Sequence, residues 1–426
     1  METYRYPEEA LWAKLMKRPT KDVATLNQTV AEVLAAVRRR GDDAVREFEL
    51  KFDQARLGSL AVDQDEMEEA ERLVDAGLRS ALELAHHNIQ TFHESQRFEP
   101  LTCHVAEGVT CWQRAIPIER VGLYVPGGTA PLFSTVLMLA TPARIAGCRE
   151  IVLCTPPSPD GRIHPAILVA ARLAGVSRIF KIGGVQAIGA MAFGTESVPK
   201  VYKIFGPGNQ YVTCAKQQVS LHDVAIDMPA GPSEVEVLAD DSANPAFVAA
   251  DLLSQAEHGR DSQSLLVTTS ETLIPQVYSE VERQLARLPR REIAAEALTH
   301  SKVFLLRDME EAMRLTNLYA PEHLIIQTRD YHELAKKVVN AGSVFLGHLT
   351  PESAGDYASG TNHTLPTNGH AVAYNGVNLD SYQRKVTFQE LTPEGLRSIG
   401  HAVERMAEGE MLEGHKQAMT LRMNTL

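Results

Sequence analysis

The sequence predicts an α/β fold made of two parallel-sheet units in tandem, with helices before them and a short helical tail after them. Short apolar strands alternate with helical patterns from residue 121 to about 220. The same alternation returns from 235 to about 346, after a stretch rich in proline and glycine at 228–233. Continuous apolar strands separated by helices are typical of parallel sheets that are covered on both faces.

The composition limits the kinds of protein to which this chain can belong. The chain has 426 residues, of which 44% are hydrophobic and 23% charged, as in ordinary soluble globular proteins. The formal net charge is −12 and no basic run exceeds three residues, which argues against nucleic acid or an anionic membrane as a partner. The apolar stretch 131–148 is interrupted by polar residues, so no membrane span is expected. The absence of a signal-peptide pattern and five unclustered cysteines together predict a cytoplasmic protein.

Residues 1–110 are expected to form an N-terminal helical segment. Apolar residues recur at helical spacing from 30 to 37, and a second helical run extends from about 67 to 92. Three histidines, His86, His87 and His93, lie in or just after that run. A solvated or capping role is favoured for them over a metal site, because no acidic or cysteine partner stands at ligand spacing.

The first α/β unit is expected at 111–233. Its strands are predicted at 121–125, 150–155, 178–182 and 200–205, and its helices at 132–146, 165–175, 185–193 and 209–220. Glycine turns fall where three of these strands end: Gly127-Gly128, Gly183-Gly184 and Gly206 to Asn209. Ligands of open parallel sheets bind at this carboxyl edge, although each turn could serve the fold alone.

The second unit is expected at 234–375, followed by a tail at 376–426. The predicted strands are 235–239, 264–269, 302–307, 323–327 and 343–346, with helices at 244–258, 271–287, 309–318 and 331–339. The tail is mostly helical from 394, carries His415 and is too short to fold alone. A helix with little apolar surface gains stability by docking, which favours exchange of this tail between the subunits of a dimer.

The first candidate site is the end of the helix predicted at 244–258. Pro245 begins this helix and Gly259 ends it. Gln255 and His258 stand three residues apart near the end, so they lie on one face. An amide oxygen and an imidazole one turn apart can bind a divalent cation, and the alternative is a polar surface at a helix end.

Two further candidate sites follow in the second unit. Glu322 and His323 come directly before an apolar strand, where an imidazole suits proton transfer near neutral pH. Adjacent residues of an extended strand point in opposite directions, so these two share a site only if the backbone bends there. The polar segment 353–363 is expected to be an irregular loop that builds a site, which makes Asp356 and His363 candidates. The alternative for each is a structural or solvated role.

Longer motifs carry a resemblance to a known family. They are Gly-Leu-Tyr-Val-Pro-Gly-Gly at 122–128, Gly-Gly-Val-Gln-Ala-Ile at 183–188, Phe-Gly-Pro-Gly-Asn at 205–209, Asp-Met-Pro-Ala-Gly-Pro-Ser-Glu at 227–234, Leu-Leu-Ser-Gln-Ala-Glu-His at 252–258, Ala-Pro-Glu-His-Leu at 320–324, Ser-Ala-Gly-Asp-Tyr-Ala-Ser-Gly-Thr-Asn-His at 353–363 and His-Lys-Gln-Ala-Met-Thr-Leu-Arg at 415–422. In order and spacing the sequence closely resembles the histidinol dehydrogenase family, from the N-terminal helices to the last ten residues.

The resemblance implies a homodimeric enzyme that uses zinc and NAD to oxidise L-histidinol through L-histidinal to L-histidine, the last steps of histidine synthesis. It also implies two incomplete Rossmann-like units with small exchanged segments, in agreement with the tandem pattern. The zinc ligands implied are Gln255, His258, Asp356 and His415 of the partner subunit. The acid–base pair implied is Glu322 and His323. Implied substrate contacts are Ser233, His363 and Glu410, beside the zinc ligands and His323. The NAD contacts implied are Tyr124, Gln186 and Asn209.

The chemistry agrees with this assignment and leaves two alternatives. Oxidation of an alcohol to an acid needs two hydride transfers and one water, so His323 is expected to take the hydroxyl proton and Glu322 to deprotonate water. The first alternative is a dehydrogenase of the same fold that acts on another small alcohol. The second is a zinc hydrolase, which would need no NAD.

Overall fold

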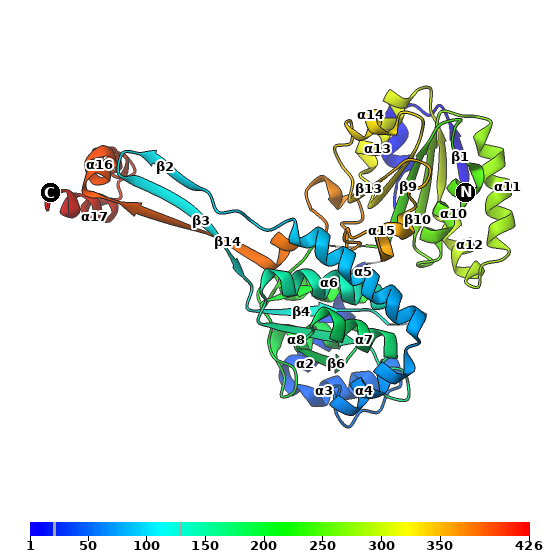
Figure 1. Ribbon diagram of the computed structural model, residues 1–426, viewed down its shortest axis with the longest axis horizontal. Coiled ribbons are helices and arrows are strands. Elements are labelled where there is room, and N and C mark those ends of the chain that lie inside the picture. The colour runs from blue at the N-terminus through cyan, green and yellow to red at the C-terminus, as the bar shows by residue number, and fades with distance from the viewer. Residues whose placement is uncertain (20–22, 128–129, 230) are drawn as a thin grey trace.

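The computed structural model describes residues 1–19, 23–127, 130–229 and 231–426; Gly128 of the predicted turn after the first strand lies outside these ranges. Two α/β bodies lie beside each other, and a slender arm projects from one of them (Figure 1). The predicted class, an α/β fold with two parallel sheets and a short helical tail, is confirmed. We call the bodies the first and second units and the projection the arm.

The first unit is built on a five-stranded parallel sheet in the order β6-β5-β4-β7-β8. Its strands are β4 (Arg120–Tyr124), β5 (Glu150–Thr155), β6 (Arg178–Lys181), β7 (Lys203–Phe205) and β8 (Ala225–Ile226). The crossover helices are α6 (Phe133–Ala146), α7 (Pro165–Ala174), α8 (Gly184–Phe193) and α9 (Gln210–Ser220). The helices α2 (Val23–Arg40), α3 (Asp42–Phe48), α4 (Gln64–Leu73) and α5 (Ala76–Glu94), with the π-helical turn η2 (Glu49–Asp53), pack against this unit.

The second unit is built on a six-stranded parallel sheet in the order β1-β11-β10-β9-β12-β13. Its strands are β1 (Glu2–Arg5), β9 (Glu234–Ala239), β10 (Gln263–Thr268), β11 (Lys302–Leu305), β12 (His323–Gln327) and β13 (Ser343–Leu346). Its helices are η1 (Glu9–Leu11), α1 (Trp12–Leu15), α10 (Pro245–Ala256), α11 (Leu273–Leu285), α12 (Arg291–His300), α13 (Met309–Tyr319), α14 (Tyr331–Ala335) and α15 (Glu352–Tyr357). Every residue of β9, β10 and β12 is buried, as expected of central strands covered on both faces.

Two expectations about local structure are wrong. The segment up to about 105 is not helical throughout, because Glu2–Arg5 and Thr102–Ala106 are strands. The strand β1 pairs in parallel with β11, from Glu2 beside Lys302 to Arg5 beside Leu305, so its partner lies far away in the sequence. The segment expected to be an irregular loop at 353–363 begins as the helix α15, which Pro351 precedes at the N-cap.

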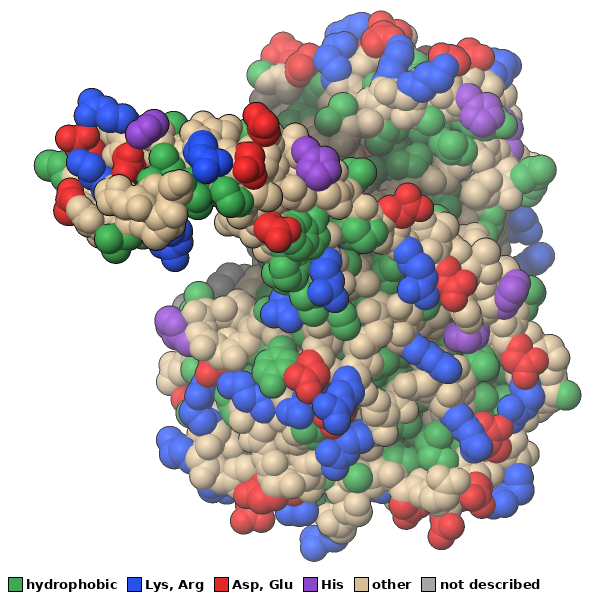
Figure 2. Space-filling model, turned by 60° about the vertical axis from the view of Figure 1, so that its left-hand side comes forward, with side chains coloured by type: hydrophobic (Ala, Val, Ile, Leu, Met, Phe, Trp, Pro, Cys, Tyr) green, Lys and Arg blue, Asp and Glu red, His purple; other side chains and the backbone are tan. Residues whose placement is uncertain are grey.

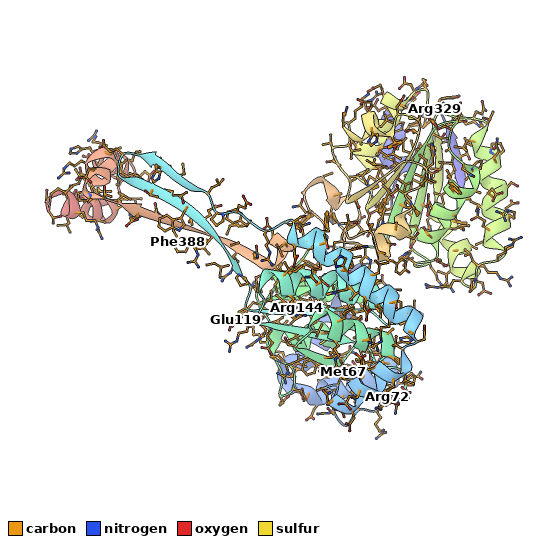
Figure 3. All side chains as sticks on the ribbon, viewed as in Figure 1. Met67, Arg72, Glu119, Arg144, Arg329 and Phe388 are labelled. Carbon is orange, nitrogen blue, oxygen red and sulfur yellow. The ribbon has the colours of Figure 1, made fainter. Side chains whose placement is uncertain are left out.

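The arm is a three-stranded antiparallel sheet with two helices at its tip (Figure 1). Its strands are β2 (Thr102–Ala106), β3 (Val109–Pro117) and β14 (Gln383–Leu391), and its helices are α16 (Pro393–Gly409) and α17 (Glu413–Met423). The rings of Trp112 and Phe388 stack 5.5 Å apart across β3 and β14, and Figure 3 shows Phe388 well away from both units. The expected tail helices are confirmed, whereas the strand before them was not expected.

The arm carries much apolar surface. Figure 2 shows it standing clear of the units, with hydrophobic side chains exposed along it. Leu101, just before β2, and Met411, after α16, are the most exposed of these side chains, at 80% and 89%. Met406, Leu412 and Leu421 at the tip are also exposed. Exposed apolar side chains in such number mark a surface that binds another protein.

Residues that follow α15 contact the first unit through hydrogen bonds and apolar packing. Asn362 donates from Nδ2 to the carbonyl of Met138 on α6 at 2.6 Å. Asn88 on α5 donates to the carbonyl of Ala358 at 2.8 Å. Further on, Leu379 and Tyr382 are buried in the core of the first unit. None of the described helices has the length and apolar character that a membrane crossing needs.

Candidate functional site at the junction of the two units

The candidate site lies at the amino edge of the second sheet. Glu234 and His323 begin the neighbouring strands β9 and β12, in which His323 pairs with Val235. Arg329, two residues beyond the carboxyl end of β12, lies on the side of the second unit that is remote from the first (Figure 3). The amino edge of this sheet therefore faces the first unit.

The backbone of one residue, Glu234, orients both members of the predicted acid–base pair. The backbone N–H of Glu234 donates to Oε2 of Glu322 at 2.8 Å, and Nδ1 of His323 lies 3.1 Å from the carbonyl oxygen of Glu234. A carbonyl oxygen only accepts, so Nδ1 carries the proton and Nε2 has the free lone pair. The backbone bends at Glu322, so the two adjacent side chains share one site, with Oε2 and Nδ1 3.6 Å apart.

The protonation states follow from burial. Burial raises the pKa of Glu322 well above its ordinary value, and the charges of Glu234 and Asp356 raise it further, against the effect of the hydrogen bond from Glu234. Burial lowers the pKa of His323 to about 3 and that of His363 to about 4. Both imidazoles are therefore neutral near pH 7, the form that accepts a proton or binds a metal.

Three side chains form a group that fits a metal ion. Ligand atoms of His258, Glu352 and Asp356 all lie within 4.8 Å of one another. Glu352 and Asp356 stand one turn apart on α15, which packs against the helix α10 that ends just before His258. Burial raises the pKa of both carboxyl groups, and their proximity to each other adds to this for Glu352. A divalent cation would offset this repulsion.

Gln255 lies at the end of α10, three residues before His258. Its side chain is fully buried, and neither its amide oxygen nor its amide nitrogen has a hydrogen-bond partner among the described residues. Buried polar groups without partners are rare in proteins, so this amide, one helical turn before His258 on a helix that packs against α15, is a candidate metal ligand. The structure thus brings three of the predicted zinc ligands, Gln255, His258 and Asp356, into one region.

His363 connects this region to the first unit. Its Nδ1 lies 2.9 Å from the carbonyl oxygen of Asp356, and its Nε2 lies 3.1 Å from the hydroxyl of Thr135 on α6. Ser233 directly precedes β9 and is half-buried, so it lies at the same sheet edge as His323. Both predicted substrate contacts are therefore near the acid–base pair.

The three predicted NAD contacts lie at the carboxyl edge of the first sheet. Tyr124 ends β4, and its hydroxyl accepts a hydrogen bond from the N–H of Gly184 at 3.0 Å. Gln186, in α8, donates to Glu49 at 2.7 Å. Asn209 caps the N-terminus of α9, because its side-chain oxygen accepts hydrogen bonds from the backbone N–H groups of Tyr211 and Val212. These residues follow three different strands and meet at one edge.

Two predicted residues lie elsewhere. Glu410 follows α16 and His415 belongs to α17, and both are exposed at the tip of the arm (Figure 1). Within one chain the arm holds them far from the amino edge of the second sheet. They reach such a site only if the arm of one subunit docks on another subunit.

The sequence reasoning missed two acidic residues. Glu352 joins the metal group, and its spacing of four residues from Asp356 after Pro351 could have revealed it, because such residues share one face of a helix. Glu49 accepts hydrogen bonds from the N–H of Gly183 and from Gln186 beside the predicted NAD contacts. No sequence signal indicated Glu49, because it comes from a helix that lies far away in the chain.

Comparison with known proteins agrees with this geometry. The profile of the histidinol dehydrogenase family matches residues 16–423. The chain is 66% identical to a histidinol dehydrogenase of Bacteroides thetaiotaomicron over the full length of both chains. It is 51% identical to that of Escherichia coli K12, over 97% of this chain and 95% of the relative. A crystal structure of histidinol dehydrogenase from Elizabethkingia anophelis superposes with a TM-score of 0.97 at 52% identity, covering 100% of this chain and 98% of the other. The chain belongs to the histidinol dehydrogenase family.

Proposed function

We propose that this chain oxidises L-histidinol through L-histidinal to L-histidine, with NAD as the electron acceptor and zinc as the bound metal. The observation that carries the proposal is that the backbone N–H and carbonyl of one residue, Glu234, orient Glu322 and His323 beside the cluster of His258, Glu352 and Asp356. Membership of the histidinol dehydrogenase family supports the substrate and the role in histidine synthesis. The first unit would then serve NAD and the second unit the metal and the chemistry.

Zinc would be held by Gln255, His258 and Asp356, with His415 of the partner subunit as a further ligand. The fit rests on the amide of Gln255 and on the buried carboxyl groups of Glu352 and Asp356: among the described residues the amide has no hydrogen-bond partner and no Lys or Arg pairs with these carboxyl groups. Glu352 lies close enough to be an alternative ligand or to orient one. Bound there, zinc supplies positive charge and a template that holds the imidazole and amine of the substrate.

NAD would be held by Tyr124, Gln186 and Asn209. Their position at the carboxyl edge of a parallel sheet supports this, because that edge is where such sheets bind nucleotides. Asn209 also marks the N-terminus of α9, which offers backbone N–H groups to a phosphate. When bound, NAD takes one hydride in each of the two oxidations.

The residues of the chain move the protons. In the first oxidation, Nε2 of His323 takes the hydroxyl proton of histidinol while the carbon loses its hydride. In the second, Glu322 takes a proton from a water molecule as the water oxygen bonds to the aldehyde carbon, and the resulting hydrate anion then loses a hydride to give the acid. Ser233, His363 and Glu410 are proposed to hold the substrate, with the last supplied by the arm of the other subunit.

The active unit is proposed to be a cytoplasmic homodimer. The exposed apolar residues of the arm and the remote position of His415 and Glu410 support the exchange of arms between two copies. In a symmetric dimer both arms can be buried, because the arm of each subunit docks on the same surface of the other subunit.

The test is to supply purified, zinc-loaded protein with NAD and L-histidinol and to follow NADH. We expect two NADH for each histidine formed. Other small amino alcohols, tested in parallel, separate this function from that of a dehydrogenase for another substrate. Failure to form NADH from histidinol would refute the proposal and leave room for a zinc hydrolase.

A further inference from the structure

Arg18 lies in the N-terminal segment and is anchored in three ways near the site. Its Nε donates to Oε2 of Glu234 at 2.7 Å, and its Nη2 lies 2.6 Å from the same oxygen. Nη2 also donates to the carbonyl of Tyr319 at 2.7 Å, and the guanidinium lies 4.0 Å from the centre of the Tyr319 ring. Such a guanidinium has little freedom to move.

The partner carboxylate belongs to the residue whose backbone orients the acid–base pair. Oε1 of Glu234 accepts a further hydrogen bond from the N–H of Asn368, so both of its oxygens are fixed. The side chain of Glu234 is 2% exposed. Its backbone N–H donates to Glu322 and its carbonyl accepts from His323. Any shift of the Glu234 side chain therefore moves the two groups that orient the pair.

We propose that Arg18 is a positioning residue, which acts through Glu234 to keep His323 in the Nδ1–H form and to aim Glu322. Without this anchor, the N–H and the carbonyl of Glu234, the first residue of β9, can shift relative to Glu322 and His323, although the preceding carbonyl, that of Ser233, still accepts from the N–H of Gln263 at 3.2 Å. The proposal goes beyond the proposed function and rests on the acid–base roles given there. It assigns to Arg18 in the N-terminal segment a part in catalysis that is exerted through Glu234.

A purely structural role is the alternative. A buried ion pair is weak evidence of stabilisation, yet loss of one partner leaves an uncompensated charge and lowers stability. Loss of stability alone would reduce activity in the same proportion in any background. A positioning role, by contrast, depends on the residue that is positioned.

The experiment is a double-mutant cycle on full-length, zinc-loaded protein, read as the first oxidation with the aldehyde trapped. Arg18→Met should lower kcat by about 10- to 100-fold, the usual cost of losing the partner of a functional residue, with little change in KM. In a His323→Ala background the same substitution should cost less than about twofold, because the group to be positioned is gone. An equal factor in both backgrounds would overturn the proposal.

Lys302→Met is the matched control. Nζ of Lys302 donates to the carbonyl of Leu15 at 2.5 Å, so this variant loosens the same N-terminal segment without contact to Glu234. It should lower the unfolding midpoint as Arg18→Met does, yet keep kcat near that of the wild type. A comparable loss of kcat in Lys302→Met would show that attachment of the segment, and not Arg18, is responsible.

A measurement independent of activity separates this proposal from the proposed function. In protein with nitrogen-15 in its histidines, the wild type should show the Nδ1–H form of His323, assigned by its loss in His323→Gln. Arg18→Met should mix in the other tautomer. If Arg18→Met leaves the tautomer of His323 unchanged, the positioning role is overturned even if the enzyme is active. Full activity of His323→Ala would instead refute the acid–base assignment, and the tautomer would still decide the role of Arg18.

Discussion

Nε2 of His323 lies 3.7 Å from Oδ1 of Asp356, so the proposed proton acceptor and a proposed zinc ligand face each other in one buried cluster. The other ring nitrogen of His323 is bound to Glu234, and the other contacts of Asp356 lead to the metal group and to His363. Proton transfer and metal binding therefore share neighbours but use different atoms. The first two predictions separate them.

Zinc should stabilise the folded chain, and this effect should depend on Asp356. At a zinc concentration of a hundred times Kd the folded state gains about 2.7 kcal/mol, measured as a rise in the thermal unfolding midpoint after metal is returned to chelated protein. Asp356→Asn should abolish this rise and Glu352→Gln should weaken binding by about tenfold or more. Glu333→Gln is the control, because the exposed Glu333 belongs to α14, which follows the carboxyl end of β12 on the opposite edge of the second sheet. Undiminished zinc affinity in Asp356→Asn would refute the ligand assignment.

Glu322→Gln should separate the two oxidations. The amide oxygen still accepts the hydrogen bond from Glu234, so the shape is kept while the base is lost. With histidinal supplied directly, oxidation to histidine should fall by about 100-fold or more, whereas oxidation of histidinol should fall much less, because only the second step consumes water. Equal losses in both steps would reassign Glu322 to holding the substrate.

All five cysteines should be dispensable. A thiol that attacks the aldehyde must be ionised and accessible, but Cys154 and Cys214 are buried. Burial raises the pKa of Cys148 to about 12, and the other two cysteines lie on the arm strands. Alanine at each position should leave turnover within about twofold of the wild type. The prediction fails if a folded variant that binds zinc and NAD has lost aldehyde oxidation.

Two inactive variants should complement each other. His323→Ala and His415→Ala, unfolded and refolded together, give mixed dimers in which one site receives both defects and the other is whole. Random pairing makes half of the dimers mixed, so roughly a quarter of the wild-type activity should return if arms are exchanged symmetrically. Each variant refolded alone is the control. If the mixture stays inactive, His415 serves its own chain or no site.

Glu236→Gln should flatten the dependence of stability on pH. Burial raises the pKa of Glu236 from its ordinary value of 4.5 to about 8. Between these values the folded state keeps a proton that the unfolded chain has released, so stability is full below the lower value and falls as pH rises towards the upper one. The slope contributed is at most about 1.4 kcal/mol per pH unit. Denaturant unfolding from pH 5 to 8 compares the variant with the wild type, and identical slopes would contradict the prediction.

The sequence predicts the central part of both sheets but not their edges. Buried strands such as β9 and β12 are continuous apolar runs, which local pattern reveals. The edge strand β1 has the sequence Glu-Thr-Tyr-Arg, and only its distant partner β11 makes it a strand. The strand β14 was missed because it forms its ladder with β3, more than 260 residues away in the chain by the pairing of Gln383 with Pro117.

The sequence predicts the site residues that lie in recognisable motifs. It does not predict the contacts between residues that are far apart in the chain. Gln255, His258, Glu322, His323 and Asp356 were found from spacing and resemblance. The structure brings the last four together, and Gln255 precedes His258 by one helical turn. The hydrogen bonds between the backbone of Glu234 and both Glu322 and His323 depend on the register of β9 and β12, which no local pattern contains. The role of Arg18 was equally hidden, because its partner lies 216 positions further along the chain.

The pairing of β1 with β11 has a consequence for the order in which the chain is made. The first strand leaves the ribosome early, but its neighbour at Lys302 follows only after the whole first unit has been synthesised. Until then the backbone N–H and C=O groups of Glu2–Arg5 lack their strand partner, and the N-terminal segment that contains Arg18 is not attached to the second sheet through β1. Closure of such a long loop is slow, so the sheet of the second unit cannot be completed before Lys302–Leu305 has been synthesised, and a bulky N-terminal fusion would interfere with the docking of β1.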